Sequence, residues 1–155
     1  MILFDTNVLI YGFSPDSPYH GWSRETLAEA SSKSEAVINP IILAELCVGD
    51  SEPNTVLDRV RSWGILSADL PTAAATLCAE AFQIYLARRE DEGRPANSKI
   101  PLPDFFIGSH AQLMGWSIAT ADLGRYQTYF PQVELVHPQG DLFIRNLPDI
   151  LKRRK

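Results

Sequence analysis

Four acidic residues lie just after predicted strands or near the start of predicted helices, where α/β enzymes often place functional side chains. Asp5 directly follows the apolar run MILF, Asp122 directly follows WSIATA, and Asp104 opens PDFFIGSHA. Glu45 interrupts the apolar run IILAELCV, where an unpaired acid would be costly to bury. Because ligands of open α/β sheets bind beyond the carboxyl ends of the strands, we expect these four acids to meet at one edge.

Each acid also has a structural interpretation. Asp5 and Asp122 could cap the helices that follow them. Asp104 would lie in the first turn of a helix, where the helix dipole favours a negative charge. Glu45 is the hardest of the four to explain in this way.

Four neighbouring carboxylates would repel one another, and a hard divalent cation would remove that cost. Carboxylate oxygens are suited to Mg²⁺ and Mn²⁺, whereas His20, His110 and His137 lack the mutual spacing of a softer metal site. Such a cation can activate water for attack on a phosphodiester. The sequence therefore predicts an acidic metal site.

Small polar residues flank two of the acids. Thr6 and Asn7 follow Asp5, and Thr120 lies two residues before Asp122. We expect these side chains to orient the carboxylates or a water molecule.

The elements that would position these residues alternate along the chain. Short strands are predicted at residues 1–4, 35–39, 65–68, 116–120 and 133–137. Helices are predicted at 6–13, 20–33, 40–49, 51–63, 70–91, 103–115 and 123–130, with a loop at 92–103. This alternation predicts an α/β fold with a mainly parallel sheet of about five strands and helices on both faces.

Length and composition limit the class of protein. The chain has 155 residues and 45% hydrophobic residues, which is typical of one globular domain. We find no membrane span and no secretory signal, and we expect Cys47 and Cys78 to be reduced, as in a cytoplasmic protein. Residues 1–138 carry 9 Lys/Arg against 17 Asp/Glu, whereas residues 139–155 carry 5 against 2. The body is acidic and the tail is basic.

Several segments together resemble a known family. FDTNVLIY, ILAEL, LPDFFIGSHA and IATADLGRYQTYF followed by VELVHP are similar to the motifs of PIN-domain ribonucleases, and more narrowly of VapC-type toxins. The resemblance covers residues 1–138, a PIN-like nuclease domain, and leaves the basic tail at 139–155 unexplained. The tail could be a disordered, solvated end or could contact RNA phosphates or a partner.

The resemblance implies a function and a site. It implies a three-layer α/β/α fold, with Asp5, Glu45, Asp104 and Asp122 as metal ligands and Asn7 and Thr120 beside them. It implies a Mg²⁺- or Mn²⁺-dependent endoribonuclease acting on tRNA, ribosomal RNA or messenger RNA. It also implies a homodimer that is neutralised by a cognate VapB-type antitoxin of a toxin–antitoxin system.

Two other functions stay open at this point. A haloacid-dehalogenase-like phosphatase also has an Asp after its first strand, but its second acid would fall at Asn7. The other alternative is a PIN-like domain that binds RNA or protein without catalysis.

The sequence also offers groups that could bind a nucleic acid. The basic candidates are Arg88, Arg89, Arg94, Lys99 and Arg125. The aromatic candidates for base stacking are Tyr11, Trp22, Trp116 and Tyr126.

Overall fold

The computed structural model describes residues 1–94 and 102–139. Lys99, most of the predicted loop at 92–103 and all of the basic tail beyond Gln139 lie outside these ranges. The predicted boundary between domain and tail therefore stays a prediction.

Among the described residues, a five-stranded sheet forms the centre of the fold. Its strands are β1 (Ile2–Phe4), β2 (Ala36–Ile38), β3 (Leu66–Ser67), β4 (Ser117–Ala119) and β5 (Leu135–Val136). The order is β3-β2-β1-β4-β5, and every pairing is parallel. Leu3 and Phe4 of β1 are fully buried, because β1 is the central strand. The predicted mainly parallel sheet of about five strands is confirmed.

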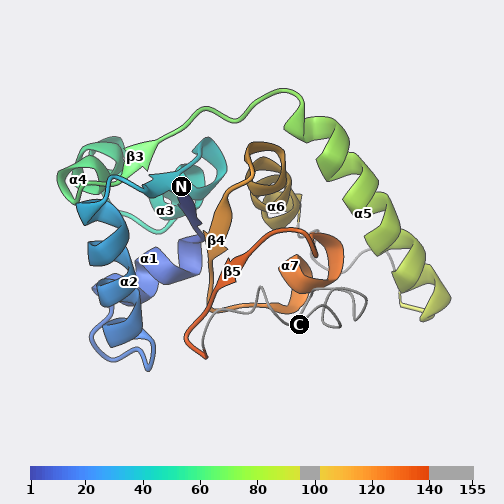
Figure 1. The fold of residues 1–155 in the computed structure, drawn as a ribbon, viewed down its shortest axis with the longest axis horizontal. Helices are drawn as coiled ribbons and strands as arrows, with labels where there is room; N and C mark the ends of the chain where they lie inside the picture. The colour runs from blue at the N-terminus through green and yellow to red at the C-terminus, as the bar shows by residue number, and fades with distance from the viewer. Residues whose placement is uncertain (95–101, 140–155) are drawn as a thin grey trace, which may run out of the picture.

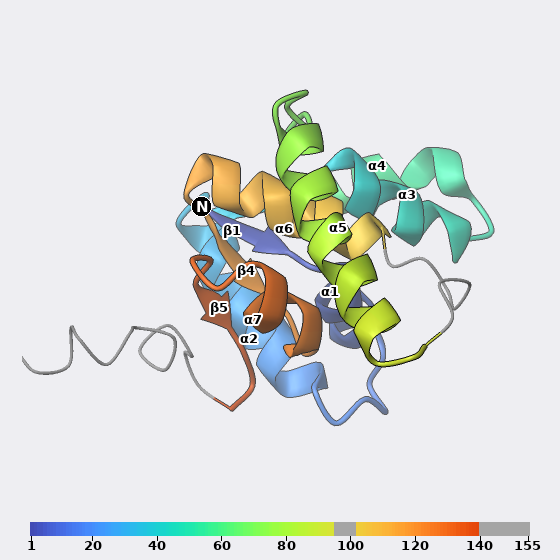
Figure 2. The same cartoon turned by 90° about the vertical axis from the view of Figure 1, so that its right-hand side faces the viewer.

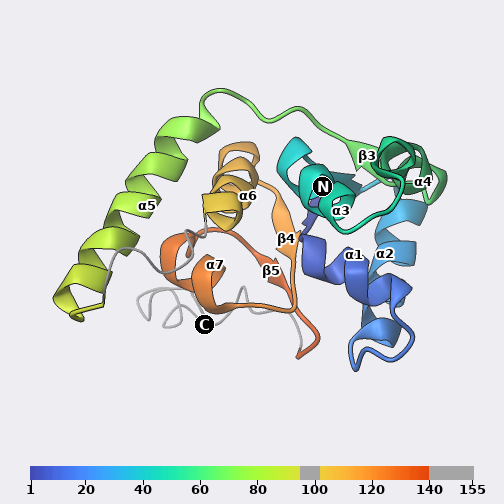
Figure 3. The same ribbon diagram turned by 180° about the vertical axis from the view of Figure 1, so that it is seen from behind.

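Helices cover both faces of this sheet (Figures 1 and 3). They are α1 (Thr6–Phe13), α2 (His20–Ser32), α3 (Pro40–Val48), α4 (Val56–Ser62), α5 (Ala74–Asp91), α6 (Leu102–Met114) and α7 (Gly124–Tyr129). Helices α1 and α2 pack together on one side, and α5 crosses over α6 on the other (Figures 1 and 2). This gives the three layers of an α/β/α fold.

Two predicted helices begin later than the sequence suggested. The segment predicted as one helix at 51–63 starts with a 3₁₀ turn at Pro53–Thr55 and becomes α-helical only at Val56. Helix α5 begins at Ala74 instead of residue 70, after Pro71. In both cases the helix starts at the first buried residue of its apolar stripe, Val56 and Ala74 respectively.

Helix α6 carries much of the core. Phe105, Ile107 and Ala111 on α6 are fully buried. Gly108 lies against the ring of Phe130, which follows α7, so closely that a Cβ at residue 108 would overlap that ring. Phe105 packs edge-on against the same ring, with 5.9 Å between ring centroids. The absence of a side chain at Gly108 therefore sets the distance between α6 and the end of α7.

Two further predictions concern cysteines and membranes. Cys78 is buried, Cys47 is half-buried, and both are free thiols. Within residues 1–94 and 102–139, no helix is long and apolar enough to cross a membrane.

Candidate functional site

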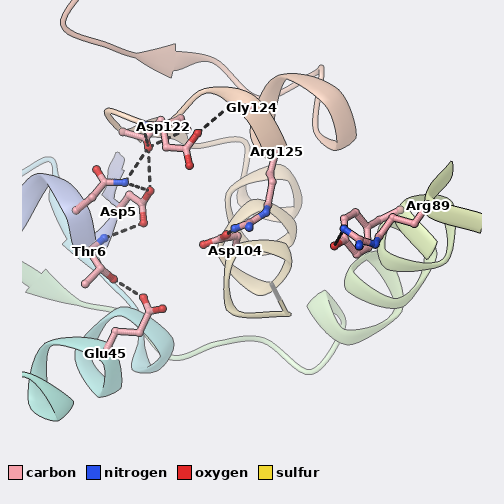
Figure 4. A network of polar contacts seen from close by, with 11 residues as sticks. Asp5, Thr6, Glu45, Arg89, Asp104, Asp122, Gly124 and Arg125 are labelled. Carbon is pink, nitrogen blue, oxygen red and sulfur yellow. Dashed lines mark hydrogen bonds and ion pairs between the residues drawn. The ribbon is translucent and has the colours of Figure 1, made fainter. Parts of the chain in front are cut away.

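One cavity brings the predicted acids together. It has a volume of about 260 Å³ and lies next to the ends of β1 and β4 (Figure 4). Asp5, Glu45, Asp104 and Asp122 all line it. The remaining lining residues are Thr6, Asn7, Ile10, Arg125 and Tyr126. Four carboxylates from distant parts of the chain thus face one space.

Asp5 is the most enclosed of these acids, with 5% of its surface exposed. One carboxylate oxygen accepts a hydrogen bond from the backbone N–H of Thr6 at 2.8 Å, so Asp5 does cap α1. The other oxygen accepts from Nδ2 of Asn7 at 2.7 Å and from Oγ1 of Thr120 at 2.8 Å. Capping therefore leaves the second oxygen of Asp5 in a polar network beside the cavity.

Burial changes the acidity of Asp5. Desolvation raises the pKa of its carboxyl from 3.8 to about 6, and the charge of Glu45 adds to this rise. The hydrogen bonds from Thr120 and Thr6 oppose it, because they favour the charged form. At neutral pH the carboxylate is ionised at a cost in free energy.

This cost predicts a pH dependence of stability. The unfolded chain loses the Asp5 proton near pH 4 and the folded chain only near pH 6, so rising pH favours unfolding between these values. We expect the contribution of Asp5 to the free energy of unfolding to fall by at most about 3 kcal/mol over this interval and to stay constant above it. Urea unfolding of the wild type and Asp5→Asn at pH 4–8 would measure the contribution as the difference between the two curves. If the free energies of unfolding of the two proteins differ by the same amount at every pH, the prediction is wrong.

Glu45 reaches the cavity from α3. Asn39 caps this helix, since its Oδ1 accepts from the backbone N–H of Ile42 at 3.0 Å. The Asn39 amide also contacts Nδ1 of His110, at 3.2 Å, and both side chains are buried. This contact joins α3 to α6. The hydroxyl of Thr6 donates a hydrogen bond to the Glu45 carboxylate, which directs that carboxylate toward the start of α1.

The other two acids come from the second half of the chain. Asp104 lies in the first turn of α6 and forms an ion pair with Arg125 of α7 (Figure 4). Asp122 precedes α7, and its Oδ1 accepts from the backbone N–H of Gly124 at 3.1 Å. The backbone N–H of Asp122 donates to Oγ1 of Thr120 at 3.0 Å, so Thr120 contacts both Asp5 and Asp122.

The donor set fits a hard divalent cation in type, because four carboxylates line the cavity and none of its described lining residues is a His or Cys. It is not a compact cluster, however. Within the described residues, no three His, Cys, Asp or Glu side chains are close enough to form a metal site as they stand. Glu45 is held by Thr6 and Asp104 by Arg125, so a cation would have to compete with these contacts.

The comparisons with known proteins identify the fold around this cavity. The family model of the PIN domain matches residues 2–131. The chain belongs to the PIN domain family. The resemblance inferred from the sequence motifs is thus confirmed at the level of the family, and no curated protein gives a significant match to this PIN domain.

Solved structures share the fold of this PIN domain. One is DNA-bound VapBC from Salmonella typhimurium, with 24% identity, a TM-score of 0.61 and coverage of 88% of this chain and 96% of that chain. Another is FitAcB from Neisseria gonorrhoeae, with 21% identity, a TM-score of 0.58 and coverage of 90% and 99%. A third is a toxin–antitoxin complex from Klebsiella pneumoniae, with 20% identity, a TM-score of 0.55 and coverage of 88% and 96%.

Tyr126 corrects one sequence-based expectation. It was a candidate for base stacking, but only 2% of it is exposed, so its ring cannot reach an RNA base. Burial, together with the charges of Asp5 and Glu45, raises its pKa well above the usual value, and the phenol stays neutral.

The other nucleic-acid candidates are distributed unevenly. Arg88 and Arg89 lie on α5, where they contact the rings of Tyr129 and Tyr85. Trp22 and Trp116 are partly buried against the core. Of the candidate cations that the structure describes, only Arg125 lines the acidic cavity.

Proposed function

We propose that this PIN domain is a Mg²⁺- or Mn²⁺-dependent endoribonuclease. The observation that carries the proposal is the meeting of Asp5, Glu45, Asp104 and Asp122 in one cavity of a PIN fold. These four carboxylates would hold the cation, which would lower the pKa of a water molecule and neutralise charge on the phosphate.

The residues around the acids support this use of the cavity. Asn7 and Thr120 fix the orientation of the Asp5 carboxylate through the hydrogen bonds described above. Thr6 fixes Glu45 in the same way. Because the Asp5 carboxylate is oriented before any ligand arrives, little conformational entropy is lost when it binds one.

We further propose that the protein is the toxin of a toxin–antitoxin pair and acts as a homodimer. The support for the toxin assignment is the fold shared with chains from the structures of VapBC, FitAcB and a toxin–antitoxin complex. The homodimer is proposed only because the sequence motifs resemble those of VapC-type toxins. The partner of this chain would then be a VapB-type antitoxin, and its substrate tRNA, ribosomal RNA or messenger RNA.

The environment of Asn7 argues against a phosphatase of the haloacid-dehalogenase type. The side chain at this position donates a hydrogen bond to Asp5 from its amide nitrogen. An amide has no acidic proton to give to a leaving group, as the second acid of such a phosphatase would. The arrangement therefore favours phosphodiester hydrolysis over a phosphoaspartate mechanism.

The test is incubation of the purified protein with total tRNA and ribosomal RNA in the presence of Mg²⁺, Mn²⁺ or EDTA. We expect discrete cuts with either cation and none with EDTA, because the acids alone cannot activate water. A small phosphomonoester should not be hydrolysed. Cuts that persist in EDTA would contradict the metal dependence, and binding of RNA without cuts under any condition would favour a domain that only binds.

A further inference from the structure

An ion pair lies inside the proposed metal site. The Arg125 guanidinium contacts Oδ2 of Asp104 across the space between α7 and α6. Both side chains line the acidic cavity (Figure 4). Asp104 is one of the four carboxylates that would hold the cation, so a positive charge of the protein already occupies part of the site.

This ion pair is open to solvent. The side chains of Arg125 and Asp104 are 43% and 25% exposed. Ion pairs with this degree of exposure contribute little net stability, because water solvates the separated charges well. The arginine can therefore leave Asp104 at low cost when a competing charge arrives.

The guanidinium and a divalent cation would also repel each other at the same carboxylate. A cation that binds Asp104 thus favours a different position of Arg125. The segment before Arg125 is anchored, since Asp122 accepts a hydrogen bond from the backbone N–H of Gly124. The released side chain would consequently stay at the cavity, with five donors suited to phosphate oxygens.

We propose that Arg125 and the divalent cation compete for Asp104, and that the released arginine binds an RNA phosphate. This inference rests on the proposed nuclease function. It makes Arg125 a positioning residue for the substrate and couples the two ligands, because each would favour the form of the site that the other binds. Without a cation, Arg125 pairs with Asp104. With a cation bound to Asp104, the Arg125 guanidinium contacts the RNA phosphate.

The first test measures Mn²⁺ binding alone, by isothermal titration calorimetry, in the absence of RNA. We expect Arg125→Gln to bind Mn²⁺ about 2- to 10-fold more tightly than the wild type, because the competitor for Asp104 is gone. Arg61→Gln is the matched control, since Arg61 forms an exposed ion pair with Asp58 on α4 and lines no part of this cavity. Asp104→Asn should weaken binding, and circular dichroism would show that each variant is folded.

The outcomes separate this inference from the proposed function. If Arg125→Gln binds Mn²⁺ as the wild type does while Asp104→Asn binds it less tightly, the metal site stands and the competition is wrong. If neither the wild type nor Arg125→Gln binds Mn²⁺, the metal site itself is wrong and the competition falls with it. If Arg61→Gln binds Mn²⁺ more tightly by the same factor, the change in affinity comes from net charge alone, and the competition is also wrong.

The second test concerns the phosphate contact. Fluorescence anisotropy would measure how the affinity for RNA depends on salt in the wild type and in Arg125→Gln. The probe is a labelled single-stranded phosphorothioate RNA, at saturating Mn²⁺. We expect the slope of log K against log salt to be smaller by about 0.7 in Arg125→Gln, which is the value for one lost phosphate contact. Identical slopes would show that the released arginine does not reach the phosphate.

Discussion

Replacing Asp5 by Asn should reduce RNA cleavage by at least about 100-fold and, at the same time, raise the thermal stability of the metal-free protein. The first effect follows because Asn removes the negative charge at the centre of the polar network formed with Asn7 and Thr120. The second follows because burial raises the pKa of Asp5 to about 6, so the ionised form is costly in the folded chain at pH 7. Asn removes that cost, and we expect a gain of about 1–3 kcal/mol.

Opposite signs in activity and stability distinguish a functional acid from a structural one. Asp58→Asn is a suitable control, because the Asp58 side chain is 86% exposed on α4. It should cut RNA as the wild type does and unfold at the same temperature. The measurements are gel mapping of cleaved tRNA and calorimetric unfolding in EDTA. An Asp5→Asn protein that unfolds at a lower temperature would show that the hydrogen bonds which the second carboxylate oxygen accepts from Asn7 and Thr120 stabilise the fold by more than burial of the charge costs.

The second large effect is expected at Gly108. An alanine at this position would place its methyl group in steric overlap with one edge of the Phe130 ring, and Phe130 is only 2% exposed. Overpacking of this kind commonly costs about 1–3 kcal/mol, and here the contact is with a buried ring that has little room to move. We expect Gly108→Ala to lower the free energy of unfolding by at least about 3 kcal/mol, as measured in urea.

Gly21→Ala provides the matched comparison. Gly21 also lies in a helix, but a Cβ there would meet no atom within 4 Å. It should stabilise the protein slightly, because alanine has the higher helix propensity. A smaller side chain at residue 130 should make room for the methyl group. The double variant Gly108→Ala, Phe130→Leu should therefore be more stable than Gly108→Ala alone. If the double variant is no more stable than Gly108→Ala, the loss of stability does not come from the contact with Phe130.

Much of the fold could be predicted because its elements carry local signals. MILF and WSIAT are short apolar runs of the kind that a buried parallel strand requires, and Gly115 ends α6 with a φ of +65° that glycine adopts readily. The predicted helix at 51–63 begins too early because helix propensity does not show where burial begins. Val56 is the first buried residue of that segment, and this depends on tertiary packing.

In the candidate site, too, the sequence predicts the features that have local signals and does not predict those that depend on tertiary packing. The four acids can be predicted because each lies at a recognisable place relative to a strand or helix. The pairing of Arg125 with Asp104 was not predicted, because nothing in the sequence shows that α7 crosses the start of α6. The burial of Tyr126 was missed for a similar reason. A tyrosine in the short helix GRYQTY carries no sign of which side faces the core.

The position of β1 in the middle of the sheet has a consequence for synthesis on the ribosome. β1 pairs with β2, which follows soon after it, but also with β4 at Ser117–Ala119. A nascent chain that ends before β4 therefore exposes one edge of its central strand, and Asp5 lacks its contact with Thr120. Such a chain also has no Asp122 and no Arg125. The four acids of the proposed site can therefore meet only after Asp122 has been synthesised, and synthesis interrupted before β4 would yield a fragment with an aggregation-prone edge.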